Sequence, residues 1–173
     1  VASRMEKYSF LHNVPMKNLL FVIPDFEMGG GQTLVIRLAN YFSKFHNVYM
    51  YNARPWLIED RIVNMISEKV TILDSNGDPS QLQEYIKHYE IDTINDHIWW
   101  ADKITYLAAK DLDTKIVLSM HGCYEALLQH PDWDGDFEKL APKILNRANE
   151  VIYATNKNKK IFETVPVYEK THL

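Results

Sequence analysis

Short apolar segments alternate with amphipathic segments along almost the whole chain, and this alternation restricts the fold more than any other feature of the sequence. The six apolar segments are residues 19–24, 48–51, 70–73, 92–95, 116–120 and 151–154. Runs of this length, rich in β-branched residues and bounded by turn residues, are typical of strands that are buried on both faces. They predict a sheet that is covered by helices on each side.

The segments between these runs repeat apolar residues with the period of a helix. The clearest series span residues 34–42, 82–89, 104–112 and 137–148, with a weaker one at 58–66. Before the second series, Asp78 is suited to cap a helix, Pro79 to open it, and Gln81 lies three residues after the cap. Strands that alternate with helices predict an α/β fold, a Rossmann-like, doubly wound and mostly parallel sheet with right-handed crossovers.

Length and composition indicate how the chain is organised. Its 173 residues suffice for one well-buried domain, expected at residues 17–173, with residues 1–16 as an extension outside the sheet. The single cysteine, Cys123, excludes an internal disulfide and favours a reducing compartment such as the cytoplasm. No apolar run approaches the length of a membrane span, and the first residues do not have the pattern of a secretory signal. The net charge of -4 argues against a general affinity for nucleic acid.

Three consecutive glycines, Gly29, Gly30 and Gly31, follow the first predicted strand and precede the first predicted helix. Bare amide groups at a helix N-terminus can approach an anion such as a phosphate. The alternative is a turn that needs glycine only for a positive φ. The spacing is neither that of the dinucleotide-binding fingerprint nor that of a P-loop. The sequence does not decide between an anion site and a turn.

Polar and aromatic residues follow the other predicted strands, at the edge where open parallel sheets bind ligands. His121 ends the fifth strand and precedes a glycine, where it can donate a hydrogen bond to a ligand hydroxyl, and His97 has the same placement after the fourth. Trp56, Trp99 and Tyr124 follow strands as well, and we take them with His97 as candidate contacts to a sugar or an acceptor. For each of these side chains the alternative is an ordinary place in the core.

Two further arrangements of reactive residues are not expected to carry chemistry. Asp96 and His97 are adjacent in an extended segment, so their side chains point apart and no metal site is predicted. Cys123 lies two residues after His121, but nothing in the sequence supplies the third group that would orient a Cys–His pair.

Four longer segments can be compared together with known families. They are NLLFVIPDFEMGGGQTLVIRLANYFSK, DTINDHIWWADKITYLAA, KIVLSMHG and RANEVIYATNKNKKIFE. In this order they resemble the N-terminal domain of the family 4 glycosyltransferases, which have the GT-B fold. The resemblance covers residues 17–173, with Gln32 standing where relatives often have Ala or Glu.

The resemblance implies two Rossmann-like domains that face each other across a cleft. The N-terminal domain mostly holds the acceptor, and the C-terminal domain binds the nucleotide sugar and carries a pair of glutamates. The implied reaction transfers a sugar, a hexose, to a glycan or lipid-linked acceptor with retention at the anomeric carbon, without a cofactor or a required metal. Gly29, Gly30 and Gly31 would lie near the donor diphosphate or sugar, and His121 would contact a hydroxyl of that sugar as the catalytic candidate.

The expected donor domain and its glutamates are absent from these 173 residues, so we expect the chain alone to be inactive. Lipid-linked acceptors would bring the protein to the inner face of the membrane. Three alternatives stay open: a Rossmann-type nucleotide-dependent oxidoreductase or epimerase, a non-catalytic flavodoxin-like binding module, and a domain that pairs with a separate donor-domain subunit.

Overall fold

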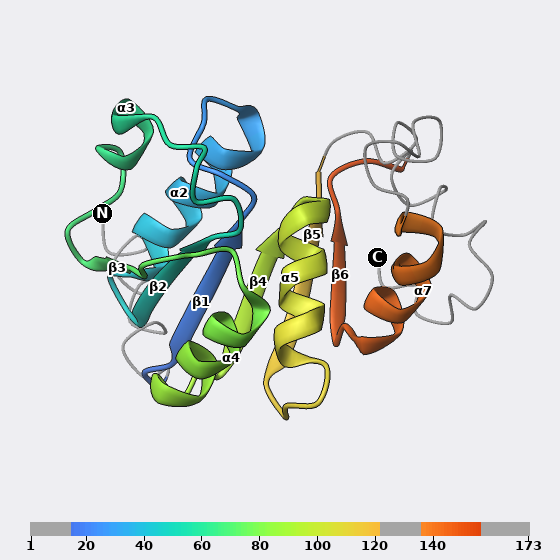
Figure 1. Ribbon diagram of the computed structural model, residues 1–173. Helices are drawn as coiled ribbons and strands as arrows, with labels where there is room; N and C mark the ends of the chain where they lie inside the picture. Colours follow the sequence, from blue (N-terminus) through green and yellow to red (C-terminus); the bar gives the residue numbers. More distant parts are fainter. Residues whose placement is uncertain (1–14, 122–135, 157–173) are drawn as a thin grey trace, which may run out of the picture.

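The strands form one parallel sheet, as the sequence predicts. The computed structural model describes residues 15–121 and 136–156. Its strands are β1 (Asn18–Ile23), β2 (Asn47–Asn52), β3 (Val70–Ile72), β4 (Thr93–His97), β5 (Lys115–Met120) and β6 (Glu150–Tyr153). They lie in the order β3-β2-β1-β4-β5-β6, with every neighbouring pair parallel (Figure 1). The predicted doubly wound sheet is therefore confirmed.

The fourth strand differs from its predicted extent, 92–95, and continues through Asp96 and His97. Both residues looked like the start of a loop because they are polar. In the sheet, Asp96 pairs with Val22 of β1 and Leu118 of β5, and His97 pairs with Ser119. The strand continues because the ladder with β5 pairs both residues and the ladder with β1 also pairs Asp96.

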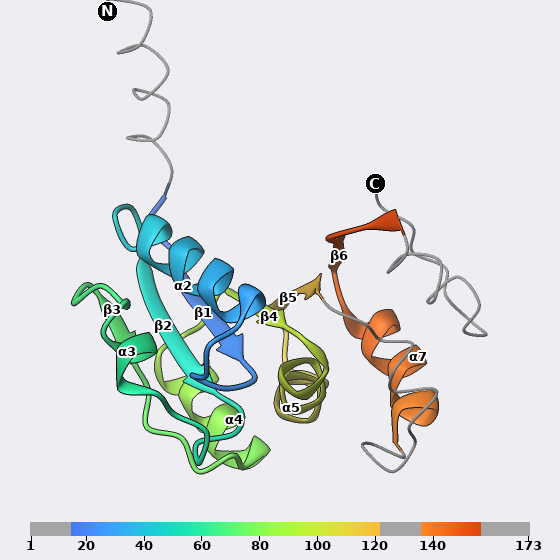
Figure 2. The same ribbon diagram turned by 90° about the horizontal axis from the view of Figure 1, so that it is seen from above.

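Helices cover both faces of the sheet (Figure 2). They are α2 (Gly30–Phe42), α3 (Asp60–Val63), α4 (Pro79–His88), α5 (Trp99–Ala109) and α7 (Phe137–Arg147). Residues of α2 and α3 pack in one apolar cluster, and residues of α4, α5 and α7 in the other. The predicted cap of α4 is confirmed, because the Asp78 carboxylate accepts a hydrogen bond from the Ser80 amide at 2.8 Å.

The central strand β1 shows why the first apolar run has no polar alternation. Leu20 and Val22 belong to the cluster on the side of α4 and α5, whereas Phe21 and Ile23 belong to the cluster under α2. All four side chains are buried. A strand between two layers of helices needs apolar residues at successive positions.

The strand order reverses between β1 and β4, and this determines where a ligand can bind. The chain leaves β1 towards α2 on one face and leaves β4 towards α5 on the other (Figures 1 and 2). Such a reversal opens a crevice beyond the carboxyl ends of the strands. The glycine segment after β1, the β4–α5 turn and His121 after β5 all lie at this edge.

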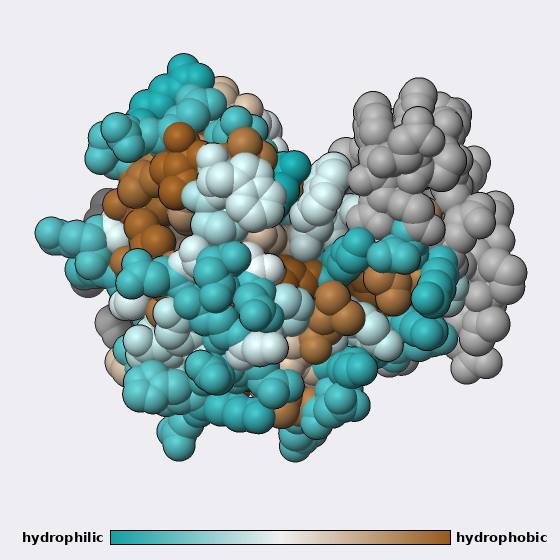
Figure 3. All heavy atoms as spheres, viewed as in Figure 1, coloured by the Kyte–Doolittle hydropathy of each residue, from teal (hydrophilic) through white to brown (hydrophobic). Residues whose placement is uncertain are grey.

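Apolar side chains also gather on the surface around α3 and the segments beside it (Figure 3). Exposed residues of this part of the chain are Trp56, Ile58, Met65 and Ile72. Among the described helices, none has both the length and the apolar character that crossing a membrane requires.

Candidate functional site

The three glycines are not there to permit a left-handed turn. Gly29 is extended, with φ -164° and ψ 158°, and α2 begins at Gly30. Within residues 15–121 and 136–156, the glycine with a positive φ is Gly77. The turn alternative therefore does not explain the glycine run. The remaining explanation is the room that a side chain would have at each glycine.

Two of the glycines make room for neighbouring side chains, and the third faces open space. A Cβ on Gly29 would lie 2.1 Å from Oε1 of Gln32, and a Cβ on Gly31 would lie 2.9 Å from Cδ1 of Ile98. A Cβ on Gly30 would have nothing within 4 Å. Ile98 itself has φ 74°, which is strained for a β-branched residue and occurs typically where structure is held for function. Gly30 is thus the glycine beside which the structure leaves open space.

The N-terminus of α2 presents backbone amides that have no acceptor within the helix. The first intrahelical hydrogen bond runs from the Thr33 amide to the Gly29 carbonyl, at 3.0 Å, so the amides of Gly30, Gly31 and Gln32 have no acceptor within the helix. The helix has no side-chain cap and no acidic residue in its first turn. Amides in this state attract anions.

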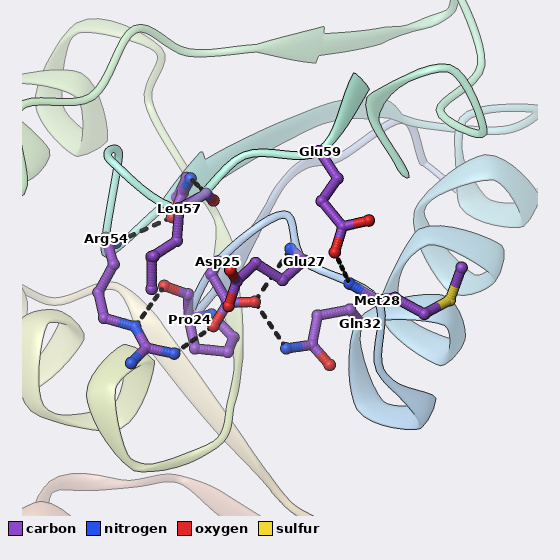
Figure 4. Close-up of polar contacts among 9 residues, drawn as sticks. Pro24, Asp25, Glu27, Met28, Gln32, Arg54, Leu57 and Glu59 are labelled. Carbon is purple, nitrogen blue, oxygen red and sulfur yellow. Dashed lines mark hydrogen bonds and ion pairs between the residues drawn. The ribbon is translucent and has the colours of Figure 1, made fainter. Parts of the chain in front are cut away.

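A buried carboxylate anchors the loop that precedes these amides (Figure 4). Asp25 is 2% exposed. Its Oδ1 accepts hydrogen bonds from the Glu27 amide at 3.1 Å and from Nε2 of Gln32 at 2.7 Å, and its Oδ2 pairs with Nη2 of Arg54. Gln32 therefore ties the first turn of α2 to the end of β1.

Arg54 holds the loop after β2 against the loop after β1. Its Nε donates to the Pro24 carbonyl at 3.4 Å, and its guanidinium lies 4.4 Å from the centroid of the Trp100 ring. Its own amide donates to Oδ1 of Asn52 at 2.8 Å. The backbone of Phe26 also bonds to Leu57 and Glu59 in the second loop. Asp25 and Arg54 each follow a strand in the sequence, but no local pattern predicts that they pair.

The two histidines at the ends of β4 and β5 lie against each other. Nδ1 of His97 is 3.0 Å from Nε2 of His121, and the two ring planes are nearly parallel, inclined by 7°, with centroids 5.2 Å apart. Nε2 of His97 is 2.9 Å from Oδ1 of Asn95. Burial, with a smaller contribution from His121, lowers the pKa of His97 to about 3, and burial also lowers the pKa of His121. Both rings are therefore neutral near pH 7.

The remaining aromatic candidates are placed differently from one another. Trp56 is 71% exposed, whereas Trp99 is 2% exposed and packs edge-on against Phe137, with ring centroids 4.7 Å apart. Trp99 is a core residue because α5 begins at it and turns its indole inward. His97 is also buried, and its Nδ1 contacts His121. Tyr124 and Cys123 lie outside the described residues.

On the other face of β4, Asp96 is buried at an unfavourable electrostatic site. Its side chain is fully buried, and neither carboxyl oxygen has a hydrogen-bond partner in the described part of the chain. Burial first, and the nearby Asp102 carboxyl second, raise the pKa of Asp96 well above its ordinary value of 3.8. The native protein therefore holds a proton at Asp96 that the unfolded chain releases above about pH 4.

We expect Asp96→Asn to be more stable than the wild type at about pH 7. Because the raised pKa belongs to the folded state, wild-type stability falls as the pH rises from about 4 toward that pKa. The neutral amide removes this loss, and the advantage of the variant should shrink as the pH is lowered to about 4. Urea unfolding at both pH values measures the two free energies.

Asp92→Asn is the control of opposite sign. Hydrogen bonds from the Asn18 amide and the Lys17 ammonium lower the pKa of Asp92. Asp92 therefore stabilises the fold above its unfolded pKa, and its amide variant should be less stable at about pH 7, with the deficit closing on acidification. A loss of stability in Asp96→Asn that does not change with pH would contradict the account of Asp96.

Within the described residues, no group of three or more His, Cys, Asp or Glu side chains is placed to hold a metal ion. Asp96 and His97 point to opposite faces of the sheet, as predicted from their adjacency. The candidate site therefore consists of the amides at the start of α2, the Asp25–Arg54 ion pair and two neutral histidines.

Comparison with known proteins shows the family of the chain. Residues 28–173 match the family model described as Glycosyltransferase Family 4. The match includes the three glycines, both histidines and every helix of the described fold. A search of curated proteins finds no match.

Proposed function

Because the chain belongs to glycosyltransferase family 4, we propose that it is the acceptor-side domain of a retaining transferase with the GT-B fold. The enzyme would transfer a hexose from a nucleotide sugar to a glycan or lipid-linked acceptor, without a metal or another cofactor. The Rossmann-like sheet is the architecture expected of one half of that fold.

The open position at Gly30 is the observation that supports this proposal most. In sugar transfer the bond between the sugar and the diphosphate breaks, and negative charge grows on the leaving diphosphate. Amides that are already oriented stabilise such charge without reorganisation during the reaction. The uncapped start of α2 offers these amides beside Gly30, where no side chain blocks an approaching phosphate.

The second part of the site would position the transferred sugar. His121 follows β5 at the same sheet edge as the glycines, and it is partly exposed, whereas His97 beneath it is buried. One hydrogen bond from a sugar hydroxyl to His121 would hold the ring in the orientation that the reaction needs. Trp56, exposed after β2, is the aromatic side chain that we assign to the acceptor.

Gly30→Ala tests the anion site with little risk to the fold. The methyl group enters open space, and alanine favours a helix over glycine by about 0.5–1 kcal/mol, so the variant should be as stable as the wild type or more so. The same methyl group would occupy the path of the diphosphate, and kcat/KM for the donor should fall about tenfold or more. Thermal unfolding and donor kinetics of the native polypeptide measure both effects.

Ser80→Ala is the matched control, since it places an alanine at an exposed first-turn position of another helix, α4. It should leave kcat/KM unchanged. If Gly30→Ala also left kcat/KM unchanged, the diphosphate would not bind at the start of α2.

The proposed architecture has its own experiment. The mass of the native polypeptide should be roughly twice the 20.3 kDa of this chain, because a donor domain of similar size would follow it. That domain would carry the glutamate pair, and the enzyme would work in the cytoplasm, at the inner face of the membrane when the acceptor is lipid-linked. A mass near that of this chain would instead require a separate donor-domain subunit.

A further inference from the structure

We propose that Asn95 and His97 are positioning residues that hold His121 in one tautomer, with the proton on Nε2 and Nδ1 free to accept a hydrogen bond. The proposal rests on the proposed function for what His121 binds, but the tautomer itself follows from contacts within the sheet. It assigns His121 to a neutral sugar hydroxyl, which donates to Nδ1, and not to the diphosphate.

The first step is the orientation of the Asn95 amide. Its Nδ2 donates to the Val117 carbonyl at 2.8 Å and to the Ser119 hydroxyl at 2.9 Å. A carbonyl only accepts, so the nitrogen of the amide must face β5 and Oδ1 must face His97. The register of β4 and β5, in which Asn95 pairs with Val117, brings these groups together.

The second step is the tautomer of His97. Oδ1 of Asn95 is an acceptor, so Nε2 of His97, 2.9 Å away, must carry the proton. The ring is fully buried and stacks on Phe21 with centroids 6.2 Å apart, in surroundings that favour its neutral form. In neutral His97 the other nitrogen, Nδ1, therefore carries only a lone pair.

The third step is the tautomer of His121, which follows from that of His97. Its Nε2 is 3.0 Å from Nδ1 of His97, and a hydrogen bond to a lone pair needs a donor, so Nε2 of His121 must be protonated. Neutral His121 then has an unprotonated Nδ1, which has no hydrogen-bond partner in the described part of the chain. The second nitrogen of a histidine commonly decides in this way what the first one can bind.

In this arrangement two different sets of groups bind the two parts of the ligand, the sugar and the diphosphate. A lone pair on Nδ1 accepts from a hydroxyl but repels a phosphate oxygen, whereas the amides at the start of α2 attract the phosphate. Both histidines also line an apolar groove of about 490 Å³ along the sheet, and the His97 end of the bond between them is fully buried. The sugar and its leaving group are thus recognised by opposite hydrogen-bonding character.

Nitrogen NMR of the labelled chain tests the tautomer without any substrate. Long-range correlations between ring protons and ring nitrogens should show His121 protonated at Nε2 and bare at Nδ1, and His97 likewise. In His97→Phe, which keeps the ring and removes both nitrogens, the Nδ1–H form of His121 should gain population. Protonation of His121 at Nδ1 in the wild type, or an unchanged tautomer in a folded His97→Phe, would overturn the proposal.

Kinetics of the native polypeptide separate positioning from structure. His97→Phe should lower kcat between about tenfold and about a hundredfold, with a small change in donor KM. His97→Asn, whose Oδ1 can replace the Nδ1 acceptor, should recover part of the loss. Equal kcat in both variants would contradict a positioning role. A native polypeptide without transferase activity, but with the expected tautomer, would contradict the proposed function and leave the positioning of His121 intact.

Discussion

Replacing His121 by alanine should lower the turnover of the native enzyme by about a hundredfold while the domain stays folded. The side chain is only partly buried at the end of β5 and belongs to neither apolar cluster, so we expect its removal to cost the fold little beyond the hydrogen bond to His97. What is lost is the hydrogen bond that would orient the transferred sugar. Steady-state kinetics and thermal unfolding, measured on the same preparations, separate the two effects.

His88→Ala is the control for this experiment, because His88 is an exposed histidine in the last turn of α4. It should leave turnover unchanged. A folded His121→Ala enzyme with wild-type turnover would remove His121 from the catalytic site.

Breaking the Asp25–Arg54 ion pair should have the largest effect on stability. Arg54→Met leaves the Asp25 carboxylate, 2% exposed, without its counter-ion. Truncating one partner of a buried pair costs about 3–5 kcal/mol, and because the Arg54 side chain is 25% exposed we expect about 3 kcal/mol. Urea unfolding measures the loss, and donor kinetics should worsen too, since Asp25 also holds Gln32 at the start of α2.

Two comparisons make this expectation specific. The double variant Asp25→Asn, Arg54→Met should lose less stability than the sum of the single variants, because no unpaired charge remains buried. Lys17→Met, which breaks an exposed pair with Asp92, should cost less than about 1 kcal/mol. Equal losses for Arg54→Met and Lys17→Met would show that the Asp25–Arg54 pair does not anchor the loops.

The sequence predicts the sheet well because the sheet is buried on both faces. Four successive apolar residues, Leu20 to Ile23, indicate a strand that lies between two layers of helices. Asp78 and Pro79 mark the start of a helix through local chemistry alone. The end of β4 escaped prediction because Asp96 is polar, and what keeps it in the strand are its partners in β1 and β5.

The site is only partly readable from local sequence. The glycines and His121 stand out because they follow strands, and the glycines lie at the start of α2. Trp99 also follows a strand, but its environment depends on Phe137, far along the chain. The Asn95–His97–His121 contacts likewise depend on the register of two strands, which no local pattern reveals.

Family membership and the residue at the end of β2 both argue against the alternative functions. A dinucleotide-dependent oxidoreductase would need an acid at the end of β2, but Asn52 is there, buried and bonded to the Arg54 amide. The match over residues 28–173 favours transfer of a sugar over oxidation and over passive binding. Binding of NAD at micromolar concentration would be the result that reopens the question.

The most direct test of the central claim is the release of nucleoside diphosphate from nucleotide sugars by the native polypeptide. Uridine, guanosine and adenosine diphosphate sugars would each be supplied with soluble and membrane extract of the source cell as acceptor, using wild type, Gly30→Ala and His121→Ala. We predict release from one donor by the wild type, and much slower release by both folded variants. Release at the same rate by all three proteins, or from no donor at all, would contradict the claim that this sheet edge receives a nucleotide sugar.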